Sequence, residues 1–149
     1  MKKHKKYMLE ALKEARKAYL LNEVPVGCII VLDDKIIARA HNKKEGTQNT
    51  VAHAEVLAIQ KANKKLNSWR LEECDMYVTL EPCLMCVGAI IQARIKHLYY
   101  SASDSKSGAL GGNFNVLENK FNHQILVTKD ILKKDSELLL KDFFKKLRK

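Results

Sequence analysis

The sequence predicts an α/β domain with three layers, in which helices cover both faces of a central sheet of about five strands. Short apolar stretches rich in β-branched and aromatic residues alternate with longer stretches whose apolar residues recur every three or four positions. This alternation is typical of layered α/β domains. No internal repeat or low-complexity linker divides the chain, and 149 residues with 46% hydrophobic content suit one domain, residues 1–149.

The first part of the chain predicts a helix followed by a β-hairpin. The helix spans about Lys5 to Leu21, and Asn22 suits its C-terminal end. Val26 to Leu32 is predicted as a buried strand. Asp33-Asp34 suits a tight turn into a returning strand from Lys35 to Ala40.

The middle of the chain predicts two helices, each preceded by a different kind of segment. Asn42 to Thr50 is polar and contains a glycine, so it predicts a loop that leads to a helix beginning near His53. Met76 to Leu80 is predicted as a central strand. It ends at Pro82, where a second helix is expected to begin and to run to Ala93.

The last part of the chain predicts two more strands and a closing helix. The strands are His97 to Tyr100 and Gln124 to Val127, and the first of them is followed by a loop from Ser101 to Gly112. A terminal helix is expected from about Ile131 to Leu147.

Composition points to a reducing compartment and an anionic partner. Four cysteines give no disulfide framework, and no apolar stretch is long enough for a signal peptide or a membrane span, so we expect a cytoplasmic protein. The net charge of +10 suits RNA. Only five of the 27 basic residues are arginine, however, so charge alone does not establish RNA binding. The lysines cluster at both ends, where Phe144 could stack on a base and Phe143 suits the core.

Three residues have the types and spacing of metal ligands. Cys83 and Cys86 lie three apart just after Pro82, so they share one face of a helical turn whose exposed N–H groups favour thiolates. His53 and Glu55 are two apart and reach one site only at the start of a helix. Three ligands, His53, Cys83 and Cys86, leave an open tetrahedral position for water, which is typical of catalytic zinc.

Two alternatives fit part of this pattern. One is a closed structural zinc site with a fourth protein ligand, and the other is a Cys-x-x-Cys pair that is redox-active or merely buried. No second Cys-x-x-Cys or His-x-x-x-His completes a structural site, and no tryptophan precedes Cys83 as in redox motifs. Cys28 and Cys74 suit small packed side chains.

The signature His53-x-Glu55 with Pro82-Cys83-x-x-Cys86 resembles that of zinc nucleobase deaminases. The whole chain is similar, in one register, to bacterial tRNA-specific adenosine deaminases of the cytidine-deaminase-like superfamily. The segments that carry this similarity are Glu23-Val24-Pro25-Val26-Gly27, Ala40-His41-Asn42, Ser68-Trp69-Arg70-Leu71, Asp104-x-Lys106-x-Gly108-Ala109 and Phe121-Asn122-His123.

The resemblance implies one Zn²⁺ per subunit and deamination of adenosine to inosine at the wobble position of a tRNA anticodon loop, with an arginine tRNA expected. As a hypothesis, Glu55 shuttles protons while zinc-bound hydroxide attacks C6 of the base. The apolar residues of the helix from Pro82 to Ala93 cannot all face one core, so part of this helix could meet a second subunit. The family resemblance likewise implies a homodimer to which this helix contributes. A helix packed wholly within its own domain is the alternative.

The resemblance further implies substrate-binding residues. Asn42 corresponds to a residue that contacts the flipped base, although its sequence context alone suits a loop cap. Asp104 corresponds to a loop residue near the RNA backbone, where a carboxylate can accept from a ribose 2′-OH. Val26 and Lys106 also match substrate-binding positions. The chain departs from the family at Thr50-Val51 and at Gly112, and we expect Val51 to line the base pocket.

Two other functions fit the same zinc motif. One is deamination of a free base or nucleoside, such as guanine or cytosine, and the other is a zinc-stabilised RNA-binding module without activity. A tRNA deaminase is favoured over both alternatives by three parts of the resemblance. These are the loop around Asp104, Phe121-Asn122-His123 and the basic terminal helix.

Overall fold

A mixed sheet of five strands forms the centre of the computed structural model, which describes residues 1–148. The strands are β1 (Gly27–Leu32), β2 (Lys35–His41), β3 (Asp75–Leu80), β4 (His97–Ala102) and β5 (Leu126–Thr128). Their order across the sheet is β2-β1-β3-β4-β5. β1 runs antiparallel to both of its neighbours, whereas β3, β4 and β5 are parallel. The predicted α/β class and the central place of β3 are confirmed.

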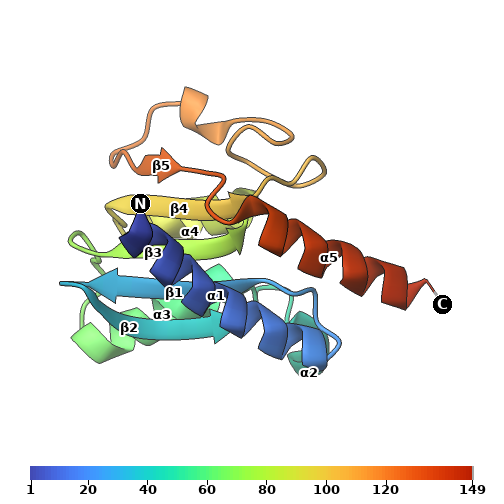
Figure 1. Ribbon diagram of the computed structural model, residues 1–149. Coiled ribbons are helices and arrows are strands. Elements are labelled where there is room, and N and C mark those ends of the chain that lie inside the picture. Colours follow the sequence, from blue (N-terminus) through green and yellow to red (C-terminus); the bar gives the residue numbers. More distant parts are fainter. Residues whose placement is uncertain (149) are drawn as a thin grey trace.

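Helices cover both faces of the sheet (Figure 1). Within residues 1–148 they are α1 (Lys2–Leu20), α2 (Lys44–Thr47), α3 (Ala54–Leu66), α4 (Leu84–Gln92) and α5 (Lys133–Leu147), with a 3₁₀ turn at Val116–Glu118. α1 packs on one face and α3 with α4 on the other, while α5 extends from the end of β4 beside α1. In this part of the chain, no helix combines the length and apolar character that crossing a bilayer requires.

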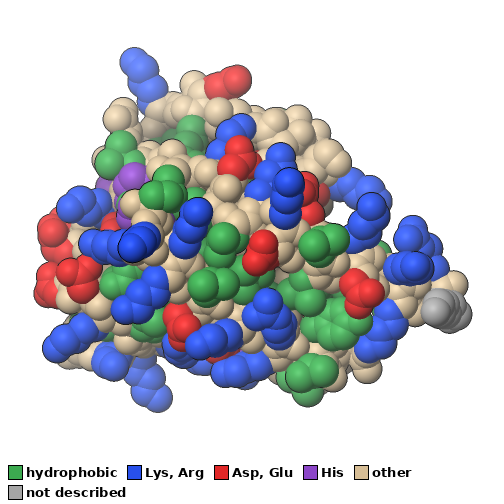
Figure 2. Space-filling view, in the orientation of Figure 1, with side chains coloured by type: hydrophobic (Ala, Val, Ile, Leu, Met, Phe, Trp, Pro, Cys, Tyr) green, Lys and Arg blue, Asp and Glu red, His purple; other side chains and the backbone are tan. Residues whose placement is uncertain are grey.

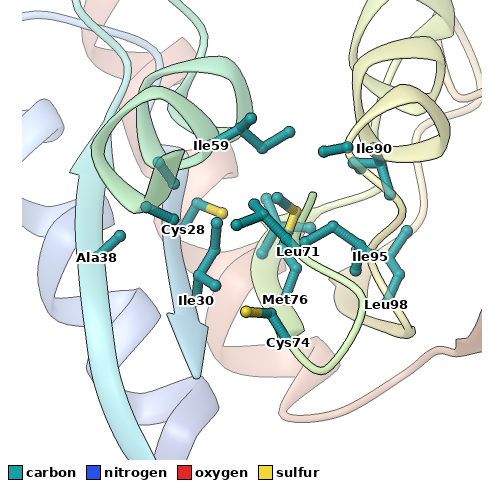
Figure 3. Packing of buried hydrophobic residues seen from close by; sticks show 14 of the residues in the cluster. Cys28, Ile30, Ala38, Ile59, Leu71, Cys74, Met76, Ile90, Ile95 and Leu98 are labelled. Carbon is teal, nitrogen blue, oxygen red and sulfur yellow. The ribbon is translucent and has the colours of Figure 1, made fainter. Parts of the chain in front are cut away.

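Alternate residues of each strand supply the two cores, because successive side chains point to opposite faces of a sheet. Figure 3 shows Cys28 and Ile30 of β1 turned toward Ile59 of α3, with Ile90 of α4 across the same core, on the side of Ile95. The intervening strand residues pack under α1, including Ile29, Tyr77 and Tyr99. Both faces of the central strands are therefore buried, which explains why their sequences are nearly continuously apolar.

The hairpin between β1 and β2 has the predicted turn. Asp33 and Asp34 both have positive φ, 49° and 61°, as a two-residue turn of type I′ requires. At the start of β1 the sheet lies very close to α1, since a Cβ on Gly27 would lie 2.0 Å from the carbonyl oxygen of Ala11. Glycine is therefore needed there for contact between helix and strand.

Several boundaries differ from the sequence-based expectation, and β5, for example, spans Leu126–Thr128 rather than Gln124 to Val127. α1 begins at Lys2 rather than Lys5. The segment from Asn42 to Thr50, predicted as a loop, contains the short helix α2. The second site helix begins at Leu84 rather than Pro82, because the carbonyl of Pro82 instead accepts a bond from the N–H of Ala109 and keeps this segment extended.

Candidate active site

Two helices begin at the same edge of the sheet, and each has a candidate metal ligand at its N-cap. His53 precedes α3 with φ −83° and ψ 148°, and Cys83 precedes α4 with φ −78° and ψ 176°. The prediction that His53 lies just before its helix and Glu55 in the first turn is confirmed. Cys83 was expected inside the first turn. It is instead the cap, and its carbonyl accepts the first helical bond from Val87.

His53, Cys83 and Cys86 form a triad whose ligand atoms all lie within 4.8 Å of one another. Nδ1 of His53 lies 3.7 Å from Sγ of Cys83 and 3.5 Å from Sγ of Cys86. Tetrahedral zinc with Zn–S of about 2.3 Å and Zn–N of about 2.0 Å puts sulfur and nitrogen about 3.5 Å apart. The donor set and its spacing therefore fit such an ion. Within residues 1–148, no fourth His, Cys, Asp or Glu joins the triad.

The electrostatics of the triad favour a thiolate at Cys83. Hydrogen bonding from the Cys86 thiol, together with that from His53, lowers the pKa of Cys83 to about 4. The bond to Cys83 raises the pKa of His53. The same pairing and burial raise the pKa of Cys86. The three groups thus share protons around one negative sulfur, and a metal ion would replace those protons.

Glu55 lies beside the triad but is not part of it. Its side chain projects from the first turn of α3 and is 4% exposed. Burial raises the pKa of Glu55 to about 7. A carboxyl group with a pKa near neutrality can both accept and return a proton at neutral pH.

A pocket of about 210 Å³ opens over the triad. Its lining includes His53, Cys83 and Glu55, and also three residues predicted as substrate contacts, Val26, Asn42 and Asp104. These residues come from the start of β1, the end of β2, the starts of two helices and the segment after β4. The fold therefore gathers residues from distant parts of the sequence at one edge of the sheet.

Asn42 caps the first turn of α3 with its side chain. Its Oδ1 accepts a bond of 2.8 Å from the N–H of Ala54. Because an N–H can only donate, this bond identifies the oxygen end of the amide. Within residues 1–148, Nδ2 of Asn42 has no such partner, so it is the end available to a ligand in the pocket. Asn42 can therefore cap the helix, as its sequence context suggested, and also contact a ligand in the pocket.

A larger groove of about 770 Å³ adjoins the pocket, and Asp104 and Ser107 line both. The two other predicted contacts, Lys106 and Phe144, line the groove and not the pocket. Phe144 is 45% exposed, whereas its neighbour Phe143 is buried as predicted. Oδ1 of Asp104 accepts bonds from the N–H groups of Lys106 and Ser107, which folds the loop locally.

Sequence reasoning missed two buried carboxylates that border the pocket. Glu23 accepts bonds from the N–H groups of Glu45 and Gly46, at 3.0 and 2.7 Å, and so caps α2. Glu81 accepts three bonds from backbone N–H groups of the segment after β4. The sequence signal for such a residue is an acidic side chain next to an apolar stretch, where burial is expected. A carboxylate buried there needs several hydrogen-bond donors.

Two positions singled out in the sequence lie away from the pocket. Val51 is 40% exposed and is not among the lining residues, so the expectation that it lines the pocket is wrong. His123 bonds through Nε2 to the carbonyl of Ile95 at 2.6 Å, near the beginning of β4 and far from the ends of the strands that border the site. His123 therefore stabilises the fold and does not line the pocket.

This layered sheet, with a His–Cys–Cys triad and a buried glutamate at the starts of two helices, defines a deaminase. A family model described as MafB19-like deaminase matches residues 2–148. The tRNA-specific adenosine deaminase of Bacillus subtilis (strain 168) is 47% identical over 144 residues, which cover 96% of this chain and 89% of that protein. The chain belongs to the family of tRNA-specific adenosine deaminases.

Solved structures agree with this assignment. One from a study of A-to-I editing by tRNA:A34 deaminases at the wobble position of transfer RNA is 40% identical, with a TM-score of 0.85 over 91% of this chain and 99% of that chain. A guanine deaminase from Nitrosomonas europaea matches with a TM-score of 0.76 over 91% of this chain and 81% of that chain. At 24% identity, it shows the shared fold alone.

Proposed function

We propose that this chain is a zinc-dependent hydrolase of one domain, residues 1–149, that converts adenosine to inosine at the wobble position of a tRNA anticodon loop. The observation that carries the proposal is the triad with one open side next to Glu55 and a pocket. An arginine tRNA is the substrate that the family resemblance implies. The reaction consumes water and releases ammonia.

Glu55 carries the proton transfers in this proposal. A zinc ion on His53, Cys83 and Cys86 would supply an acidified water as the nucleophile for C6. Glu55 removes a proton from the water and delivers it to N1 of the base. It then takes the remaining hydroxyl proton and passes it to the amine, which leaves as ammonia. A pKa of about 7 suits Glu55 to both directions of transfer.

Asn42, Val26 and Asp104 would hold the nucleoside. Because Oδ1 of Asn42 is engaged by Ala54, its Nδ2 would donate to an acceptor on the base edge. Val26, 5% exposed at the start of β1, gives the base an apolar wall. Oδ1 of Asp104 holds its own loop, and within residues 1–148 Oδ2 has no hydrogen bond, so it would accept from a ribose 2′-OH.

The groove next to the pocket suits nucleotides on either side of the target base. Phe144 offers an exposed aromatic ring for stacking, and Lys106 and Arg148 offer cations for phosphates. Figure 2 shows Lys and Arg side chains gathered on the outer part of α5, whereas elsewhere on that face they are mixed with Asp and Glu. A free base would use only the pocket. Lys149, the last of the lysines that cluster at the C-terminal end of the sequence, lies outside the described residues.

We also propose that two copies associate through the outer face of α4. Leu84 is 55% exposed and Met85 36%, and a Cβ on the adjacent Gly88 would meet no atom within 4 Å. Ile90 is buried on the opposite side of this helix, against the sheet, and Val87 and Ile91 are buried beside it against Ala109. The apolar outer face is therefore available to a second copy, and the family resemblance implies such a homodimer.

The test compares substrates and one variant. Purified protein is incubated with tRNA transcripts, free adenosine, cytidine and guanine, and the products are analysed for inosine and other deaminated species. We expect inosine only from tRNA and no product from the Glu55→Ala variant, with zinc near one per chain in both proteins. Product from a free base or nucleoside would favour a deaminase of such small substrates. No product from any substrate, with zinc retained, would favour a zinc-stabilised RNA-binding module without activity. Loss of zinc in Glu55→Ala would make Glu55 a ligand.

A further inference from the structure

Glu81 is a buried carboxylate for which the proposed reaction has no use. It follows the last residue of β3 and is 3% exposed. Its Oε1 accepts a bond of 3.0 Å from the N–H of Asp104, and its Oε2 accepts bonds of 2.9 and 3.0 Å from the N–H groups of Leu110 and Gly112. Three N–H donors to one carboxylate are a strong and directional arrangement, because each bond is charge-assisted.

The segment from Asp104 to Gly112 is built around this carboxylate. A Cβ on Gly108 would lie 2.4 Å from Cδ and Oε2 of Glu81, and a Cβ on Gly112 would lie 2.5 Å from Oε1. Both glycines would also bring a Cβ too close to the carbonyl oxygen of Asp104, at 2.5 and 2.2 Å. The loop can therefore close on the carboxylate only where it has no side chains.

The same segment forms the wall shared by the pocket and the groove. Asp104 and Ser107 line both spaces. The loop is also tied to the segment that carries the ligand Cys83, through a bond from Ala109 N–H to Pro82 carbonyl and a β-bridge between Cys83 and Gly108. Movement of this loop would displace the carboxylate of Asp104 relative to the triad.

From this arrangement we infer that Glu81 is a positioning residue, which fixes the loop from Asp104 to Gly112 and thereby sets where bound RNA meets the pocket. Its two oxygens are engaged by backbone N–H groups, so it acts through the loop and not on the substrate. The identity of the ligand in this inference rests on the proposed function. The anchoring of the loop by Glu81 is independent of it.

Amide hydrogen exchange tests the anchoring directly on the zinc-loaded protein. In Glu81→Ala, the N–H groups of Asp104, Leu110 and Gly112 should exchange about 10-fold faster or more, because each loses a charge-assisted acceptor. Glu81→Gln keeps one side-chain oxygen as an acceptor, so fewer of these three N–H groups should exchange faster. Gly108→Ala acts on the same contact from the loop side, and its effect should be smaller in the Glu81→Ala background. Unchanged exchange at these three amides in Glu81→Ala would overturn the inference.

Binding of a tRNA transcript, measured in the Glu55→Ala background to prevent turnover, tests the positioning. Glu81→Gln should weaken binding about 10-fold without changing the dependence of the dissociation constant on salt, because no cation is removed. Zinc content should stay near one per chain. Glu14→Gln is the matched control, since Glu14 is also 3% exposed but pairs with Lys17 and Arg39 on the far side of the sheet from α3, and its variant should bind tRNA like the parent.

The outcomes separate this inference from the proposed function. Faster exchange with unchanged tRNA affinity would overturn the positioning role, as would loss of zinc, because Glu81 would then act on Cys83 rather than on the loop. If the parent chain neither binds nor deaminates tRNA, the proposed function fails and the positioning role fails with it. The exchange data would still decide whether Glu81 anchors the loop.

Discussion

The side-chain oxygen of Asn42 accepts a 2.8 Å hydrogen bond from the N–H of Ala54, the first residue of α3. One amide therefore holds the start of the helix that carries Glu55 while its other end borders the pocket. The end of β2 and the start of α3 are thus fixed relative to each other by the same side chain that is proposed to bind the base.

Two substitutions of Asn42 should separate its structural and substrate-binding roles. Asn42→Asp keeps an acceptor for Ala54 but removes the Nδ2 donor, so deamination should fall about 100-fold with stability nearly unchanged. Asn42→Ala also removes the cap and should lower the free energy of unfolding by about 1 kcal/mol. Steady-state kinetics and urea unfolding measure the two effects. Equal activity in Asn42→Asp and the parent would exclude the donor role.

Removal of the metal should expose one reactive thiol. With a pKa of about 4 and a half-buried side chain, Cys83 would be a thiolate once a chelator has removed zinc. Cys28 and Cys74 are buried, and burial raises the pKa of each. Mass spectrometry after brief alkylation should therefore find Cys83 modified at least about 10-fold faster than these two, and protected in the zinc-loaded protein. Modification of Cys74 first would contradict this electrostatic picture of the site.

His4 of α1 and His97 of β4 should make stability depend on pH. Tyr99 stacks on His4 and on His97, with ring centroids 4.3 and 4.0 Å apart. Burial is the main cause that lowers the pKa of both histidines below 6.5. The N-terminal amine and Lys3 add to this at His4, and His4 and Lys96 add to it at His97, while Asp75 opposes it at both. The unfolded chain therefore binds more protons between the lowered values and 6.5, so these groups reduce stability as pH falls through that window.

The double variant His4→Phe/His97→Phe should keep the stacking and lose this titration. Its free energy of unfolding should fall less than that of the parent between about pH 7 and about pH 5. Denaturant unfolding of both zinc-loaded proteins measures the difference, and the protonation of the metal ligands, common to both, cancels. A variant that loses as much stability as the parent would show that the two histidines titrate alike in the folded and unfolded states.

Basic residues at the end of α5 should determine how tRNA binding depends on salt. Replacing Lys145 and Arg148 by glutamine should reduce the slope of log affinity against log salt by about 0.7 to 0.9 for each phosphate that is no longer neutralised. Lys146 is left in place because its ammonium group lies over the ring of Tyr19. Lys64→Gln/Lys65→Gln, at the opposite end of α3 from the pocket, is the control and should leave the slope unchanged. An unaltered slope in the α5 variant would remove these residues from the interface.

Association of two copies should depend on Leu84. Leu84→Glu places a charge on the apolar outer face of α4, where burial against a partner would be unfavourable. Analytical ultracentrifugation should find two chains together for the parent and one for the variant. Leu138 of α5 is 68% exposed, and Leu138→Glu should leave the association intact. A parent chain that sediments as a monomer would contradict the dimer.

The sequence was sufficient to predict most of the elements and to single out the candidate metal ligands, because both depend largely on local patterns. The turn at Asp33-Asp34 and the cap position of His53 follow from residue type and spacing over a few positions. Cys83 and Cys86 are likewise close in the chain. The start of α4 was misplaced because the bond between Pro82 and Ala109 joins segments far apart in sequence.

The sequence by itself determined the class of fold, the family and the three candidate ligands. Only the tertiary structure decided which residues form the walls of the pocket, and it assigned Glu23 and Glu81 to their backbone donors. Those bonds join residues more than twenty positions apart. A carboxylate carries no local sign of the amides that will satisfy it, because its partners are set by how the chain packs and not by the residues beside it.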